Sequence, residues 1–568
     1  MNIKQLTVHN FRGIKSLDWI IPDQRIVCLI GKGDTTKSTI LDAIRYVLFP
    51  SWNPSFDELD FYGGDTSLGI KIVVTLGDLP ESFFNDSKYG LLLRGWDNGS
   101  KVLHDEPEDE RLEPVITAVL KIDHNLEPTW TVFCDRLPDG RPFRVGDRAS
   151  AYATFIGAYS DFHLTWSRNS ALSHITDPEN ILTLLSQAAR SAKDALNSSR
   201  STKLTSFDLA ATETEKIARA FGVPVSVEGA YKAQLDTGAV NIRMGGLSLH
   251  DDNMPLRRLG LGSRRMLTFG IQHLGLKDPH ITLIDEIEFG LEPHRISRLL
   301  KKLASDENGQ YFITTHSPVV LRELSVDQLS VVQCLNGGIQ ITLTAIPVLN
   351  DLIQGRMRSA AEAFLSKKIL LCEGATEVGI SRGLDNIWTS SGEEAFAFHG
   401  IATLDGGGSS KLLTTAKALK ELGYDVFVLA DSDANDFSEA DAQALISLEI
   451  EVIRWEGGVS VEQFFFNHLP WSNVIDSINL AVELNGTGVI DQIKTEYASI
   501  NNDPDSWEHS PELRNAIGIA AKKSTWFKRI DKSEKWAQII SEPLVNPTGI
   551  IGTHISKIKT WAINAATT

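Results

Sequence analysis

Four acidic side chains follow two apolar segments, and their spacing suits the binding of metal ions. Glu373 comes directly after residues 369–372, and Glu377 lies four residues further on, so both carboxylates share one face of the helix that we expect to begin there. A second apolar segment, residues 426–430, runs into Asp431 and Asp433, which an extended chain points the same way. Buried carboxylates need neutralising, and two hard divalent cations held by them could clamp both sides of a phosphodiester displacement.

The order of these elements resembles a Toprim domain, the metal-dependent phosphoryl-transfer module of topoisomerases, primases and some nucleases. The resemblance rests on a strand, Glu-Gly, a helix, a second strand and the Asp-Ser-Asp sequence at residues 431–433. Read alone, the two glutamates are solvated charges at a helix end and the Asp-Ser-Asp sequence is a turn. Glu462 is a candidate for a further metal-site acid, although a charge at a helix N-terminus explains it almost as well.

The composition is that of an ordinary globular protein of several domains. The chain has 568 residues, 42% hydrophobic and 23% charged, and its net charge of −18 argues against a surface that coats nucleic acid. Its four cysteines lie far apart without a CxxC pair, which argues against zinc and a secreted disulfide framework. There is no signal-peptide pattern and no apolar run of about eighteen residues, so we expect a cytoplasmic protein without membrane contact.

A glycine-rich loop follows a predicted strand at residues 25–30. Residues 31–39 read GKGDTTKST and precede a helix, which is the context that a P-loop requires. Lys37 would reach the β and γ phosphates of ATP, and Ser38 would hold Mg²⁺. The loop residues expected to cradle the phosphates are Gly31, Gly33 and Thr39. A fortuitous glycine turn is the alternative.

The loop departs from the P-loop consensus at one position. Thr36 stands where a glycine is expected directly before the lysine. The backbone must bend tightly there, and a β-branched residue resists the required dihedral angles. We therefore expect a nucleotide site in which hydrolysis is weakened or slow.

Three later segments complete the pattern of an ATPase. A glycine-serine turn within residues 255–265 opens a predicted helix at 266–274, and its amides could receive a second phosphate. A buried strand, residues 281–284, ends in Asp285 and Glu286, which would support Mg²⁺ and polarise the attacking water. The strand at 311–314 leads to His316, beside the γ-phosphate, although a lone histidine at a strand end is usually structural. The residues of the glycine-serine turn that we single out are Gly260, Gly262 and Ser263.

Taken together, these motifs resemble the ATP-binding-cassette (ABC) heads of the SMC/RecF type over about residues 1–350. The resemblance implies a head-to-head homodimer, in which the signature turn of one subunit completes the ATP site of the other. The signature here, LGLGS, departs from the usual LSGGQ form. Two predicted helices, at about 177–196 and 206–221, interrupt the strand pattern and are either a dimerisation arm or an extra packing layer.

We therefore expect an α/β chain in which an ABC-type P-loop ATPase head with a helical insertion precedes a Toprim domain of Rossmann-like α/β fold. The predicted parts are an N-terminal ATPase lobe at 1–175, the insertion at 176–224, a C-terminal ATPase lobe at 225–350 and a Toprim domain at 358–568. Asp60 could contact nucleotide or metal, but a solvated loop acid fits it better. The glycine turn at 406–411 is either a close-packing loop or a phosphate contact, and packing fits it better.

The C-terminal segment has a charge opposite to that of the whole chain. Residues 513–568 carry nine Lys and Arg against three acids. Within them, KKSTWFK at 522–528 places basic residues around an aromatic pair, which suits a DNA backbone, and one lysine could stabilise the developing phosphorane charge. An amphipathic helix with a solvated basic face is a nearly equal alternative.

An SMC-like head followed by a Toprim domain resembles the OLD (overcoming lysogenisation defect) family of ATP-dependent nucleases. The family implies Mg²⁺- or Mn²⁺-dependent cleavage or nicking of DNA, often in bacterial defence against phage, with the ATPase dimer as a gate. Carried over to this chain, the resemblance implies that Lys528, or Lys522 and Lys523, assists the transition state. It implies that the metals are held by Glu373, Glu377, Asp431, Asp433 and Glu462.

Two other functions remain open. The chain could be a RecF-like DNA repair ATPase whose Toprim half binds DNA without cutting, although the complete set of acids argues against it. It could also be a nucleotide-sensing subunit that acts through a partner, such as a helicase or a reverse transcriptase with its RNA, and Thr36 mildly favours sensing over turnover. The sequence leaves open the DNA structure preferred, nicking against double-strand cutting, and the trigger.

Overall fold

The computed structural model describes residues 1–157, except 34, 52–53, 108–109 and 152, and residues 249–563, except 275–278, 336–337, 344–349, 434–435 and 541–548. Between them it describes 161–164, 211–216 and single positions, so the predicted helical insertion lies largely outside the described residues. The chain divides into two compact units. One contains Met1–Phe155, Pro279–Glu288 and Pro293–Thr568, and the other contains Ile156–Asp278 and Phe289–Glu292.

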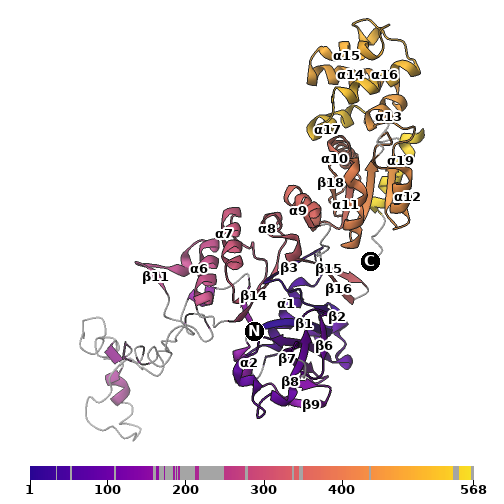
Figure 1. Ribbon diagram of the computed structural model, residues 1–568. Helices are drawn as coiled ribbons and strands as arrows, with labels where there is room; N and C mark the ends of the chain where they lie inside the picture. The colour runs from indigo at the N-terminus through magenta and orange to yellow at the C-terminus, as the bar shows by residue number, and fades with distance from the viewer. Residues whose placement is uncertain are drawn as a thin grey trace. The chain divides into compact units, whose positions relative to one another are not determined.

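A mixed sheet forms the centre of the N-terminal part of the first unit (Figure 1). Its inner strands pair in parallel in the order β13 (His280–Ile284), β14 (Gly309–Thr314), β3 (Ile26–Ile30) and β15 (Leu329–Leu335). β3, β13 and β14 are buried along their whole length, as their runs of apolar residues predict for parallel strands covered on both faces. The parallel order brings the C-terminal ends of these strands to one edge, where the P-loop begins.

The sheet continues on one side into a largely antiparallel wing, in which the strands at residues 2–11 and 14–20 alternate between more and less buried residues. The wing contains β16 (Gly338–Leu343), β2 (Ile14–Ile20), β1 (Asn2–Phe11), β4 (Ile70–Gly77), β7 (Glu113–Ile122), β5 (Arg94–Asp97), β6 (Val102–His104), β8 (Pro128–Cys134) and β9 (Leu137–Pro142), and β10 (Ala153–Ile156) borders β13. The helices of this part are α1 (Lys37–Val47), α2 (Val145–Ser150), α7 (Pro293–Ala304) and α8 (Pro318–Glu323).

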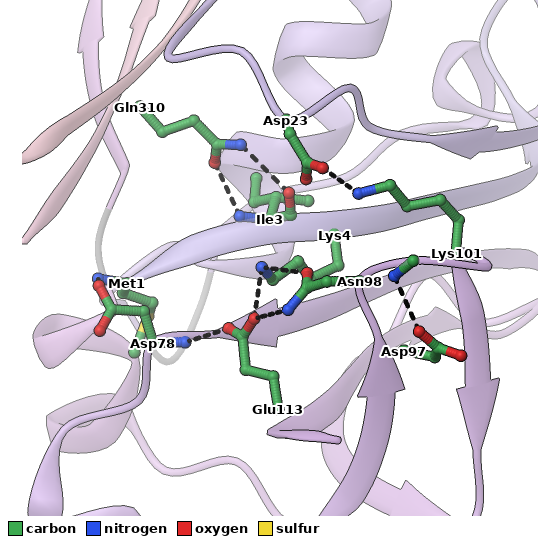
Figure 2. Close-up of polar contacts among 11 residues, drawn as sticks. Met1, Ile3, Lys4, Asp23, Asp78, Asp97, Asn98, Lys101, Glu113 and Gln310 are labelled. Carbon is green, nitrogen blue, oxygen red and sulfur yellow. Dashed lines mark hydrogen bonds and ion pairs between the residues drawn. The ribbon is translucent and has the colours of Figure 1, made fainter. Parts of the chain in front are cut away.

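Two buried polar contacts hold β1 in place (Figure 2). The side-chain amide of Gln310 on β14 accepts a hydrogen bond from Ile3 N–H at 2.7 Å and donates one to the Ile3 carbonyl at 3.1 Å. Next to it, Lys4 is 8% exposed and pairs with Glu113 of β7 at 2.7 Å. Buried backbone groups must find hydrogen-bond partners, and the Gln310 side chain supplies them for the N–H and carbonyl of Ile3.

The second unit contains the hairpin of β11 (His250–Asp251) and β12 (Met254–Pro255) and the helix α6 (Leu261–Leu274). The helix begins at Leu261, so the sequence prediction of Met266 was wrong. Arg264 N–H already donates to the Gly260 carbonyl at 3.1 Å, which makes the glycine-serine turn the first turn of the helix. Glycine and serine cost helical stability but do not prevent a first turn.

A parallel four-stranded sheet lies in the C-terminal part of the first unit (Figure 1), in the order β18 (Ile401–Asp405), β17 (Lys368–Cys372), β19 (Asp425–Ala430) and β20 (Glu451–Arg454). The sequence predicts β17 and β19, whereas β18 was not predicted because its IATLD sequence has no clear apolar run. The flanking helices are α9 (Asn350–Ser359), α10 (Ala375–Ser390), α11 (Ser409–Glu421), α12 (Glu439–Ile446) and α13 (Val461–His468). This is the Rossmann-like α/β arrangement that the sequence predicts.

A group of helices follows the sheet and packs on α10 and α13. They are α14 (Trp471–Asn485), α15 (Gly488–Glu496), α16 (Pro511–Lys523), α17 (Ile530–Ile539) and α19 (Gly549–Ile563). α10 and α17 approach closely because Gly379 and Gly383, one turn apart, face Ser533 and Ala537, and a Cβ on either glycine would lie within 2.2 Å of those side chains. None of the described helices is long and apolar enough to span a bilayer.

Candidate functional site

Two glutamates lie where β17 passes into α10. Glu373 directly follows the strand, and its Oε2 accepts a hydrogen bond from Asp431 N–H at 2.8 Å. Glu377 is 4% exposed, and its Oε2 accepts from Gly374 N–H at 3.1 Å, which caps the first turn of α10. Both carboxylates therefore lie at the C-terminal edge of the sheet, although Glu373 precedes α10 and does not share a face of that helix with Glu377.

Three further acids reach the same place from β19 and α13. Asp431 follows β19 and accepts a hydrogen bond from Val461 N–H at 2.8 Å, at the start of α13. Glu462, in the first turn of α13, is 5% exposed, and its Oε1 accepts from the Thr376 hydroxyl at 3.4 Å. Asp433 is half-buried and forms an ion pair with Lys522. The structure thus brings together all five acids that the sequence singles out.

Burial first, and the charges of neighbouring carboxylates second, raise the pKa values of three of these acids. Burial, then the charges of Glu373 and Glu462, raises the pKa of Asp431 to about 8. Burial and the neighbouring Asp431 and Glu462 raise the pKa of Glu377 well above its usual value, and burial raises the pKa of Glu373. A cluster of this kind titrates as a group and stays fully ionised at neutral pH only beside a cation.

The donor set fits hard divalent cations. All five candidate ligands offer carboxylate oxygens, the ligands that Mg²⁺ and Mn²⁺ prefer. Among the residues that the structure describes, Lys522 alone forms an ion pair with any of them, so the charge of the cluster exceeds that of its protein partners. The residues that could hold metal are Glu373, Glu377, Asp431, Asp433 and Glu462.

The aromatic pair within the predicted basic segment at residues 522–528 does not lie at the surface. Trp526 and Phe527 are fully buried, and Phe527 stacks on Trp536 with ring centroids 4.4 Å apart. The aromatic pair is therefore part of the helical core, and the prediction that it faces DNA was wrong. Trp526 and Phe527 stand between lysines because the segment presents its aromatic side chains to the core and its lysines to solvent. Buried aromatic rings contribute strongly to such a core.

The lysines of this segment remain at the surface. Lys522 bonds to Asp433, and Lys523 pairs with Glu496 at 2.8 Å. Lys528 is exposed, and its charge lowers the pKa of Glu373, which places it beside the carboxylate cluster. Lys528 and Lys522 are thus the two candidate cations of the site.

The glycine turn before α11 serves packing. A Cβ on Gly406 would lie 2.8 Å from the Cys372 carbonyl. Gly408 N–H donates to the Glu373 carbonyl at 2.9 Å, so the turn supports the backbone that carries this acid. The packing interpretation of residues 406–411 fits these contacts.

The P-loop lies between β3 and α1 and holds its lysine inside the loop. Lys37 is 5% exposed, and its ammonium donates to the carbonyls of Gly31 at 3.2 Å and Lys32 at 2.7 Å. A phosphate would take the place of such carbonyls, because the ammonium is a mobile point charge. Gly33 lies within the loop, and Thr39 lies in the first turn of α1.

Thr36 adopts the left-handed conformation that the consensus glycine would supply. Its φ is 63°, and its hydroxyl donates to the Thr35 carbonyl at 2.6 Å. Its methyl group occupies the space above Gly13, where an added Cβ would lie 2.6 Å from Thr36 Cγ2. The absence of a side chain at Gly13 therefore makes room for threonine in place of the consensus glycine. The left-handed backbone of Thr36 costs about 1–2 kcal/mol.

We expect Gly13→Ala to destabilise the ATPase head by about 1–3 kcal/mol through over-packing, and to weaken nucleotide binding. Thr36→Ser removes the clashing methyl and should be nearly neutral alone, yet it should restore the stability of Gly13→Ala. Thermal unfolding and nucleotide titration of the two single variants and the double variant measure this coupling. If the effects of the two substitutions on stability and nucleotide affinity simply add, the contact between the Thr36 methyl group and Gly13 does not influence the loop.

The acids after β13 contact the P-loop helix. Ser38 Oγ donates to Asp285 Oδ1 at 2.8 Å, and Thr314 Oγ1 on β14 donates to the same oxygen at 2.6 Å. Glu286 is exposed, and its φ of 45° is a strained conformation for a residue other than glycine. The structure therefore brings Ser38 and Asp285 together, as a shared Mg²⁺ site requires.

The other predicted nucleotide residues lie at turns. His316 follows β14 and is exposed. In the second unit, Gly262 and Ser263 lie in the first turn of α6 and Gly260 directly precedes it, so their amides belong to a helix N-terminus.

The sequence did not single out Arg12, which lies at the end of β1. Its guanidinium pairs with Asp60 at 2.8 Å and also with Asp42 on α1. Asp60 is 9% exposed, so the interpretation of Asp60 as a solvated loop acid was wrong. No local pattern in the sequence marks Arg12, because its partners Asp42 and Asp60 lie 30 and 48 residues away.

Two family models match parts of the chain. Residues 124–322 match a family described as "AAA domain, putative AbiEii toxin, Type IV TA system". Residues 364–433 match one described as "Overcoming lysogenization defect protein-like, TOPRIM domain". No curated protein matches the chain at a significant level.

Several solved structures are similar to the chain at low identity. The SMC head bound to the C-winged helix domain of ScpA is 13% identical with a TM-score of 0.33, covering 60% of this chain and 97% of that one. The SMC head domain from Thermotoga maritima is 16% identical with a TM-score of 0.28, covering 60% and 99%. The Smc head with an extended coiled coil, bound to the C-terminal domain of ScpA derived from Pyrococcus furiosus, is 11% identical with a TM-score of 0.34, covering 62% and 99%. The two segments matched by the family models follow one another in the order that the motifs predict.

Proposed function

Because the chain joins an ABC-type ATPase head to an OLD-like Toprim domain, a combination typical of enzymes that act on nucleic acid, we propose that it is an ATP-regulated, divalent-metal-dependent DNA endonuclease. The observation that carries the proposal is the convergence of five carboxylates at the C-terminal edge of one parallel sheet, with the pKa of Asp431 raised to about 8 by burial and by Glu373 and Glu462. Such a cluster is costly for folding and is explained by a cation.

The protein side of the reaction follows from the positions of these residues. Glu373, Glu377, Asp431, Asp433 and Glu462 would hold Mg²⁺ or Mn²⁺. Bound metal would supply activated water and stabilise the charge that develops on the scissile phosphate. Lys528 would contact that phosphate. Two observations support this role: its charge lowers the pKa of Glu373, and no residue that the structure describes forms an ion pair with it. Lys522, which pairs with Asp433, would be released if a metal ion neutralised that carboxylate.

The ATPase site would control when DNA is cut. Lys37, Ser38 and Asp285 would bind ATP with Mg²⁺, and Glu286 and His316 would act on the γ-phosphate. Two heads would meet across their signature turns, so the active form is a homodimer. The resemblance of the Toprim segment to the OLD family leads us to propose a role in bacterial defence against phage, with a helicase or a reverse transcriptase and its RNA as candidate partners.

A plasmid cleavage assay tests the proposal directly. Supercoiled DNA is incubated with the protein and Mg²⁺ or Mn²⁺, with ATP, ADP, a non-hydrolysable analogue or no nucleotide. We expect metal-dependent nicked or linear product whose amount changes with nucleotide, and we expect Lys37→Ala to keep the basal cleavage and lose the nucleotide response. Identical cutting in every nucleotide state would remove ATP control.

The second candidate function is a nucleotide-sensing subunit without nuclease activity of its own. The observation that favours it is Thr36 in the left-handed conformation, since strain in the P-loop slows turnover. Absence of cleavage with every metal and nucleotide, together with measurable ATP binding, would support this function and contradict the nuclease.

A further inference from the structure

Two turns meet at the C-terminal ends of the parallel strands β13 and β14. We call residues 285–288 the acidic turn and residues 315–317 the switch turn. Glu286 N–H donates to Thr314 Oγ1 at 2.8 Å, and Ile287 N–H donates to the Thr314 carbonyl at 3.1 Å. The hydrogen bonding of the two strands therefore continues beyond their ends, and the acidic turn is fixed to the last residue of β14.

The last residue of the acidic turn, Glu288, holds the switch turn with both carboxylate oxygens. Oε2 accepts a hydrogen bond from the Thr315 hydroxyl at 2.7 Å, and Oε1 accepts one from His316 N–H at 2.6 Å. The Thr315 hydroxyl also accepts from Ser317 N–H at 3.0 Å. One side chain thus orders all three residues of the switch turn.

A carboxylate suits this task better than a neutral side chain. It offers two acceptor oxygens, whereas an amide side chain offers one acceptor and one donor. Among the described residues, neither a lysine nor an arginine forms an ion pair with Glu288, so its charge is satisfied by the hydroxyl and the amide of the switch turn. Half-burial of an unpaired carboxylate costs free energy, which indicates that the contact serves a purpose beyond the stability of the fold.

We propose that Glu288 is a positioning residue that sets the direction of His316 toward the γ-phosphate of ATP. The His316 side chain is exposed, and no hydrogen bond fixes it within the described part of the chain, so its direction depends on its backbone. Glu288 holds that backbone at the amide. The inference rests on the proposed ATPase role of His316. It identifies Glu288 as the residue through which the acidic turn, which also carries Glu286, holds the backbone of His316.

Steady-state ATPase kinetics of Glu288→Gln test the inference. Glutamine keeps the shape and leaves one of the two donors without a partner, so we expect kcat to fall about tenfold, the equivalent of one hydrogen bond to a charged group. The dissociation constant for ATP should stay unchanged, because the phosphate-binding groups are elsewhere, and the midpoint of thermal unfolding should fall by no more than about 2–4 °C, as the loss of one hydrogen bond predicts for a protein of this size. The matched control is Glu323→Gln on α8, an exposed glutamate bonded to Ser297, which should leave all three values unchanged.

A double-mutant cycle with His316→Ala separates positioning from a structural role. If Glu288 acts through His316, Glu288→Gln should change kcat by less than about twofold in the His316→Ala protein. An equal tenfold loss in both backgrounds, or a joint loss of ATP affinity and thermal stability, would overturn the inference. An unchanged kcat in Glu288→Gln would also overturn it and would leave the proposed function standing. If the wild-type protein does not hydrolyse ATP, both the assignment of His316 and this inference are overturned. DNA cleavage is measured in a separate assay, so the nuclease proposal is tested independently of ATP hydrolysis.

Discussion

Replacing Asp431 with asparagine is expected to lower metal-dependent DNA cleavage by at least about a thousandfold while making the metal-free protein more stable. The two effects have one cause. Asp431 lies among Glu373, Glu377 and Glu462, and burial together with the charges of Glu373 and Glu462 raises its pKa to about 8. Asparagine keeps the shape and an oxygen that can accept from Val461 N–H, but it removes one negative charge from the cluster.

The gain in stability follows from the raised pKa. A tenfold weaker acid in the folded state corresponds to about 1.4 kcal/mol of unfavourable interaction for the ionised form. At pH 8 and above, the ionised Asp431 therefore costs the metal-free fold a few kcal/mol, of the order that a buried unpaired charge costs elsewhere. The asparagine variant avoids this cost and loses a metal ligand. Such an exchange of stability for activity is typical of functional sites.

Calorimetric unfolding in a metal chelator and plasmid cleavage in Mn²⁺ measure the two effects on the same samples. Asp436→Asn is the matched control, because Asp436 is an exposed aspartate in the same loop, and it should change neither value. Loss of cleavage with a lower unfolding midpoint would indicate a damaged fold. Retained cleavage would show that the carboxylate cluster is not the active site.

The elements that hold the site were predictable because their signals are local. A glycine loop between an apolar strand and a helix, and acids directly after apolar strands, depend on spacing over a few residues. The carboxyl ends of parallel strands meet at one edge of a sheet, so Glu373 and Asp431 had to lie close once both strands were recognised. Glu462 was uncertain from the sequence because a helix N-terminus attracts acids for its own reasons.

The contacts that were missed depend on tertiary structure. Trp526 and Phe527 follow lysines at the spacing of an exposed basic segment, and only the stacking on Trp536 shows that they are buried. Asp60 resembles a loop acid until Arg12, 48 residues away, is placed beside it. Thr36 and Gly13 compensate each other across two separate turns. Pairs of this kind need coordinates, because neither partner is unusual by itself.

The second large effect is expected from metal and pH together. In metal-free protein, the pKa of folded Asp431 is about 8, above the ordinary aspartate value of 3.8. The folded state then binds more protons than the unfolded state between these values, so stability falls as pH rises from about 4 to about 8. The raised pKa values of Glu377 and Glu373 act in the same direction. The metal-free protein should therefore be most stable in mildly acidic buffer and progressively less stable toward pH 8.

Metal reverses this dependence because it competes with protons for the same oxygens. At pH 8, Mn²⁺ should raise the unfolding midpoint of the wild type by several degrees, and at pH 5.5 by much less, as mass action requires for a ligand that binds only the ionised cluster. Calorimetry at the two pH values, with and without Mn²⁺, measures both slopes, and Asp431→Asn should flatten them. Equal stabilisation at both pH values would place the metal elsewhere. A metal-free stability that rises toward pH 8 would mean that these carboxylates are neutralised by the protein itself, and the argument for a metal-dependent nuclease would lose its main support.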